Sequence, residues 1–112
     1  MHYSLDKLNE LGDGDQDFVI SVIAVFVEET PDDLESLGNA VTSEDYTAIY
    51  QASHKMKPNI DLMGMEEVTK EILSIENNGK NKSNMDAIKI AFTAVKPIIL
   101  ETIDELKATY SL

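Results

Sequence analysis

The sequence has 112 residues, 43% of them hydrophobic, which is enough for one domain with a core of its own. Asp and Glu number 21 against 9 Lys and Arg, and the resulting net charge of −12 repels nucleic acid and anionic membranes. The chain contains no cysteine, which excludes disulfides, thiolate metal sites and cysteine catalysis.

Residues 1–12 contain no cationic stretch followed by an apolar core, so they do not resemble a signal peptide. The longest apolar run, residues 18–27, is broken by Ser21 and has about half the length that a bilayer span requires. We therefore expect a cytoplasmic monomer in which residues 1–112 form one domain. Neither nucleic acid nor a membrane is expected as a partner.

Residues 3–11 carry leucines at intervals of three and predict a short helix, with Ser4 as its cap and Gly12 at its end. The acidic turn at 13–17 suits the start of a following helix, because negative charge is favourable at a helix N-terminus. Residues 18–27 are rich in β-branched side chains and are also compatible with a buried strand. We favour a helix, since no second strand-like run exists to pair with this one.

This helix is expected to continue over residues 28–38 with a more polar surface. Pro31 predicts a kink there, because proline removes a backbone donor. The next helix begins at the capping residues 42–45 and runs to about Gly64.

A further helix is predicted for residues 65–76, followed by a polar loop over residues 77–83 and a last helix over residues 84–109. The last helix has an apolar seam at alternating steps of three and four residues, formed by Ile88, Phe92, Val95, Ile99 and Leu106. Such a seam is typical of helix bundles. The pattern as a whole predicts an all-α fold, an antiparallel four-helix bundle with a short N-terminal cap helix.

Metal binding is not expected. Asp13, Asp15 and Asp17 resemble the opening of a calcium loop, but Phe18 stands where that loop needs glycine and Ala24 where it needs glutamate. A capped turn explains these acids better. Di-iron bundles need a glutamate three residues before each histidine ligand, and the residue three before His54 is Gln51.

Nucleotide binding is not expected either, because the glycines are scattered and form no cradle for phosphates. A chain without an ATP site must receive any phosphoryl group from another protein. The sequence therefore does not predict an enzyme.

His54 is the residue with the most chemical interest, at the middle of the polar side of its helix. Lys57 lies one turn further on, close enough to share an anion bound by the imidazole. Pro58 lacks the amide that would bond the His54 carbonyl, so it distorts the helix at that histidine. Two interpretations remain open, a functional site and an inert surface histidine beside a tolerated kink.

The segment 53–57 followed by Met63 and Gly64 is similar to the signature of histidine-containing phosphotransfer (HPt) domains. That signature is a small residue, histidine, any residue, an aliphatic residue, lysine and a small residue, with glycine ten places after the histidine. Residues 26–31, followed by Leu34 and Leu37, also resemble the first long helices of the family. The resemblance covers essentially the whole chain.

The resemblance implies that His54 is the phosphoacceptor, through its Nε2 atom, and that Lys57 steadies the phosphoryl oxygens. Lys55, on the flank, adds positive potential. Gly64 matches the glycine that lets the helix end pack closely or turn. Pro58 departs from the family, since most members have glycine there, and this puts a straight helix in question.

The function implied is that of a phosphorelay intermediate, a phosphocarrier and not an enzyme. It would shuttle a phosphoryl group between receiver-domain aspartates of hybrid sensor histidine kinases and response regulators. A neutral imidazole is a competent nucleophile near physiological pH, since its unperturbed pKa is about 6.5. No cofactor of its own is expected, because the partner receiver domain would supply Mg²⁺. A receiver-binding adaptor without phosphotransfer and a purely structural bundle are the alternatives.

Docking of a receiver domain requires an apolar patch beside His54. We expect this docking face to combine the N-terminal helix, the start of the next helix and the Tyr50 side of the histidine helix. Its predicted members are Leu8, Leu11, Phe18, Tyr50, Gln51 and Asp61. The alternative is that the leucines simply cap the bundle.

Overall fold

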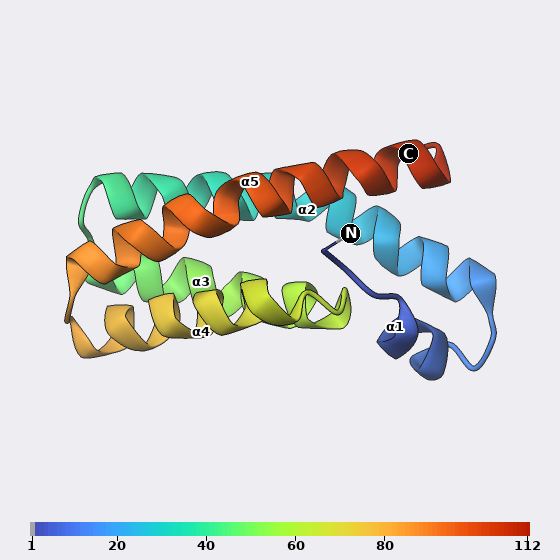
Figure 1. Ribbon diagram of the computed structural model, residues 1–112, viewed down its shortest axis with the longest axis horizontal. Coiled ribbons are helices and arrows are strands. Elements are labelled where there is room, and N and C mark those ends of the chain that lie inside the picture. The colour runs from blue at the N-terminus through green and yellow to red at the C-terminus, as the bar shows by residue number, and fades with distance from the viewer. Residues whose placement is uncertain (1) are drawn as a thin grey trace.

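The computed structural model describes residues 2–112, and this part of the chain contains five helices. They are α1 (Asp6–Leu11), α2 (Gln16–Thr42), α3 (Tyr46–Leu62), α4 (Glu66–Asn81) and α5 (Met85–Tyr110). The four long helices run antiparallel to their chain neighbours, with α2 and α5 lying over α3 and α4 (Figure 1). The predicted all-α bundle with a short N-terminal helix is confirmed.

The β-branched run at 18–27 lies within α2, so the strand interpretation is wrong. Asp15 caps this helix, since its side chain accepts hydrogen bonds from the amides of Asp17 and Phe18. Helical spacing places Val19, Ile23 and Phe26 in the core. The helix continues through Pro31 to Thr42, four residues beyond the predicted end at Gly38.

The segment before α1 is not helical, so this helix is shorter than predicted. It begins at Asp6, with Leu5 at the cap position in place of Ser4. The Ser4 amide instead donates to the carbonyl of Met63 at 2.9 Å, which ties the N-terminal segment to the end of α3. The backbone of Gly64 is left-handed there (φ 64°), and a Cβ at Gly64 would lie 2.6 Å from the Ser4 carbonyl oxygen.

The predicted polar loop at 77–83 is wrong for most of its length, because α4 extends to Asn81. Gly79 is buried, and a Cβ there would lie 2.9 Å from the Tyr50 amide nitrogen on α3. Close packing against α3 therefore keeps a polar, glycine-containing segment helical against its own propensity. The start of α5 agrees with the prediction, since Asn84 caps it through the amide of Ala87.

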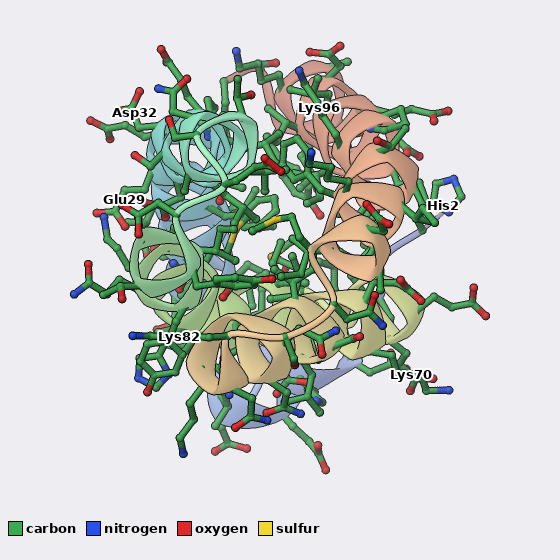
Figure 2. All side chains as sticks on the ribbon, turned by 90° about the vertical axis from the view of Figure 1, so that its left-hand side faces the viewer. His2, Glu29, Asp32, Lys70, Lys82 and Lys96 are labelled. Carbon is green, nitrogen blue, oxygen red and sulfur yellow. The ribbon has the colours of Figure 1, made fainter. Side chains whose placement is uncertain are left out.

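A single core of apolar side chains lies between the four long helices, and each of these helices contributes side chains to it (Figure 2). Leu8 of α1 is completely buried in this core. Its insertion explains how a helix of six residues stays attached to the bundle. The site described next lies on the outer side of α3, where that helix packs against α4.

Candidate functional site

His54 stands on the outer face of α3 with 63% of its side chain exposed. Its ring stacks on that of Tyr50, one turn earlier, with centroids 5.6 Å apart and an angle of 24° between the planes. Both residues belong to one helix, so helical spacing alone brings the rings together. The imidazole is thus supported on one side and open to solvent on the other.

Glu76 of α4 forms a hydrogen bond with the imidazole of His54. Its Oε2 lies 2.8 Å from His54 Nδ1, and its Oε1 accepts a hydrogen bond of 2.7 Å from Lys57 Nζ. The Glu76 side chain is only 8% exposed, whereas that of Lys57 is 30% exposed. One buried carboxylate therefore joins the histidine and the lysine that sequence analysis paired.

Burial acts to raise the pKa of Glu76, but the hydrogen bonds from Lys57 and His54 and their positive charge outweigh it, so this pKa is lowered. The carboxyl group is therefore ionised at neutral pH. A carboxylate only accepts hydrogen bonds, so the proton of the neutral ring belongs on Nδ1. This assignment leaves the lone pair on Nε2, as in histidines held by a carboxylate in metal sites.

Gly79 explains how Glu76 comes so near. The close approach of α4 to the α3 backbone occurs at Gly79, three residues after Glu76 and therefore on a neighbouring part of the same helix face. On α3, the buried hydroxyl of Ser53 donates to the Ile49 carbonyl at 2.6 Å, so the polar group next to His54 has a hydrogen-bond partner within its own helix.

The chain matches the family model of the Hpt domain over residues 21–109, which includes α3, α4 and nearly all of α5. The chain belongs to the Hpt domain family. No curated protein and no solved structure matches the chain.

Hpt domains take part in histidine phosphotransfer in phosphorelays and interact with receiver domains. They are phosphocarriers and not catalytic enzymes. The sequence singled out His54, Lys55 and Lys57 as candidate site residues but not Glu76, which the structure places against two of them. The available signal was its position: it follows Ile72 by four residues and so lies on the apolar side of its helix.

Lys55 points to a different neighbour from Lys57. Its Nζ lies 2.8 Å from Oδ1 of Asp33 on α2, whose side chain is 5% exposed. The Asp33 hydrogen bond and charge, together with Glu29 and Asp32, raise the pKa of Lys55. Figure 2 shows Glu29 and Asp32 on the outer side of α2. Lys55 therefore joins α3 to α2, while Lys57 joins the imidazole side of α3 to α4.

Pro58 does not end the helix, since α3 continues through it to Leu62. Of the other residues expected around the site, Gln51 and Asp61 are exposed and Tyr50 is half-buried. Asp61 Oδ1 accepts a hydrogen bond of 2.8 Å from Lys7 Nζ, which joins α1 to α3.

The predicted docking face needs one correction. Leu8 is a core residue and is not accessible to a partner, because its apolar side chain is fully covered by the bundle. Leu11 and Phe18 are exposed, by 63% and 37%. Leu11 borders a surface pocket together with Lys7, Glu10 and Leu62, close to the end of α3.

In residues 2–112, no group of three or more His, Cys, Asp or Glu side chains is arranged to hold a metal ion. Within these residues, no helix has both the length and the apolar character that a membrane span needs.

Proposed function

We propose that His54 is the phosphoacceptor of a phosphorelay intermediate. It takes a phosphoryl group from the aspartyl phosphate of one receiver domain, such as that of a hybrid sensor histidine kinase, and passes it to the aspartate of a response regulator. The observation that carries this proposal is the exposed ring whose Nδ1 is held by Glu76 at 2.8 Å. The partner receiver domain supplies Mg²⁺, and residues 1–112 act as one domain.

The chemistry follows from that hydrogen bond. Nε2 attacks phosphorus in line with the bond to the aspartate oxygen, that bond breaks, and the aspartate leaves as a carboxylate. Phosphoryl transfer depends mainly on positioning and on stabilisation of charge, so few groups are needed on this side. Lys57 supplies positive charge for the phosphoryl oxygens while its neighbour Glu76 keeps the ring in place.

The receiver domain docks over the α3 face around His54 and over the exposed part of α1 and α2. This docking face consists of Tyr50, Gln51, Asp61, Leu11 and Phe18. Its two apolar members are exposed, as a transient protein interface requires. Chemical-shift mapping with a receiver domain tests the face: no perturbation at Leu11 or Tyr50 would remove it from consideration.

The acceptor is tested by incubation with receiver domains that carry ³²P from labelled acetyl phosphate. The wild-type chain is expected to gain label that is labile in acid and stable in alkali, and His54→Gln is expected to gain none. His2→Gln, which removes the second histidine of the chain, should label normally. Label that persists in His54→Gln would refute the assignment. A wild-type chain that binds receivers but stays unlabelled would be an adaptor.

A further inference from the structure

The group that holds the imidazole is a carboxylate, although a neutral amide oxygen would accept the same hydrogen bond. What the carboxylate adds is negative charge, within 2.8 Å of Nδ1 and in a side chain that is 8% exposed. This charge acts most strongly when the ring itself is positive. The ring is positive when Nε2 carries a phosphoryl group and Nδ1 keeps its proton.

We propose that Glu76 retains the proton on Nδ1 of phosphorylated His54 and thereby keeps the phosphoryl group labile for transfer. This inference rests on the proposed function, in which His54 is the phosphoacceptor. Glu76 is a positioning residue in this account, since it acts through the imidazole and touches neither phosphorus nor the receiver aspartate.

The transfer balances without any movement of a proton. In the forward step the Nε2 lone pair forms the N–P bond, the acyl phosphate P–O bond breaks, and the ring becomes a cation with Nδ1–H directed at Glu76 Oε2. In the reverse step an aspartate oxygen attacks phosphorus, and the N–P electron pair returns to Nε2. The leaving group is then neutral imidazole. Without the Nδ1 proton it would be imidazolate, a far stronger base and a poorer leaving group.

The surroundings of Glu76 favour this role. Its two oxygens have separate partners, His54 at Oε2 and Lys57 at Oε1, so Lys57 can turn to the phosphoryl oxygens without breaking the ring contact. The pKa of Glu76 is lowered, so the group accepts the Nδ1–H bond without taking the proton.

Other ionisable groups lie on the helices around the ring. Tyr50 stacks on it from α3, Lys80 follows Glu76 by one turn on α4, and the Asp33–Lys55 pair closes the α2 side. Replacement of Glu76 by glutamine therefore leaves Lys57 as the nearest charge, which favours loss of the Nδ1 proton.

The test measures the lifetime of the phosphohistidine and needs no receiver domain. The 112-residue chain with His2→Gln, in which His54 is the only remaining imidazole, is labelled with potassium phosphoramidate. Loss of the phosphoryl group is followed by ³¹P NMR from pH 5 to pH 9. The rate should fall at a higher pH in this protein than after the further change Glu76→Gln. At pH 8 the Glu76→Gln variant should lose its phosphoryl group about tenfold more slowly. Loss of the adjacent opposite charge is expected to lower the protonated fraction of the phosphorylated ring by about that factor. The two rates should agree at pH 5.

Glu71→Gln is the matched control, because it makes the same charge change at an exposed position of α4 and should leave the profile unchanged. Coincident profiles for Glu76→Gln and its parent would overturn the inference. A second readout needs no variant at Glu76: ¹H–¹⁵N spectra of the phosphorylated parent should show Nδ1 protonated at pH 8, and an unprotonated Nδ1 would equally overturn it. If the proposed function is wrong, the outcome is different: the chain does not exchange a phosphoryl group with phosphorylated receiver domains.

Discussion

Lys57 and Lys55 are two residues apart in the sequence, yet their side chains contact different helices. Lys57 shares the carboxylate that holds the imidazole, whereas Lys55 pairs with a buried aspartate on α2. Both lie beside His54 in the sequence, and both were expected to stabilise the phosphoryl group. Their substitution should therefore have different consequences.

We expect Lys57→Ala to slow phosphotransfer from a labelled receiver domain by at least tenfold, because it removes the cation that shares the Glu76 carboxylate with the imidazole. Lys55→Ala should leave the rate within about twofold but lower the stability, because it leaves the buried carboxylate of Asp33 without its partner. Single-turnover labelling and urea unfolding measure the two effects. Equal rates for Lys57→Ala and wild type would show that Lys57 is ordinary surface.

Glu76 also makes the stability of the bundle depend on pH. Its pKa is lower in the folded protein than in the unfolded chain, so its stabilising contribution is present at neutral pH. The contribution is lost as the pH falls from about 4.5, the ordinary pKa of glutamate, through the lowered pKa of Glu76. In urea unfolding, the free energy of unfolding of the wild type should exceed that of Glu76→Gln at pH 7, and the difference should be smaller at pH 3. A difference that is constant with pH would contradict this linkage.

The sequence points to His54 and its lysines as candidates because all three lie within one helical turn and a short motif. It did not reveal Glu76, which lies 22 residues from His54 and meets it only when α4 packs on α3. Local spacing predicts contacts within a helix, and it has no information on the rotation of one helix against another. Leu8 was misplaced for a related reason, since its spacing does not say whether a short helix faces the core.

At the scale of the helices, Gly79 is a position where α4 closely approaches the backbone of α3. Alanine has the higher helix propensity by about 1 kcal/mol, so Gly79→Ala would stabilise an isolated helix. In this protein a Cβ there would lie 2.9 Å from the Tyr50 amide, and backbone does not yield easily. We expect Gly79→Ala to lower the melting temperature and to weaken the His54–Glu76 hydrogen bond, seen as a shift of the ¹⁵Nδ1 resonance.

Gly38→Ala provides the comparison for that substitution. A Cβ at Gly38 in α2 would meet the end of the Phe92 side chain at 3.1 Å, and a side chain can rotate away. The melting temperature should therefore stay level or rise, with an unchanged ¹⁵Nδ1 resonance. Equal effects of the two substitutions would show that close packing at Gly79 does not set the site.

The starts of α3 and α5 were predicted from their capping residues, whereas packing between helices determines the end of α4. Asp45 and Asn84 cap α3 and α5 as their residue types indicate. The stretch 77–81 has the composition of a loop, but its glycine lets α4 pack against α3, and the added contacts keep it helical. Tertiary contact thus overrides a weak local preference.

At the scale of the whole molecule, α1 depends on a single buried side chain. The exposed Lys7–Asp61 ion pair adds little, since exposed pairs contribute about 0–1 kcal/mol. Leu8→Ala should therefore destabilise the protein by about 2–5 kcal/mol in urea unfolding. Lys7→Ala should change it by less than about 1 kcal/mol. Similar values for the two would show that Leu8 is not the anchor of α1.

The four-helix architecture itself was predictable, because 3.6-residue periodicity and turn residues divide the chain into helices whose apolar faces must be buried together. The molecule that results is elongated, with extents of 42 × 23 × 20 Å. Its long axis follows α2 and α5, as Figure 1 shows.

The unequal lengths of the helices give this elongated shape a direction. α2 has 27 residues and α3 has 17, a difference of about 15 Å at 1.5 Å per residue. The longer pair therefore projects past the shorter pair as a ledge, with α1 beneath it (Figure 1). Under the proposed function, we expect a receiver domain docked at His54 to find this ledge on one side of the histidine only. The unequal ends of the bundle should then favour one orientation of the receiver domain over the reverse one.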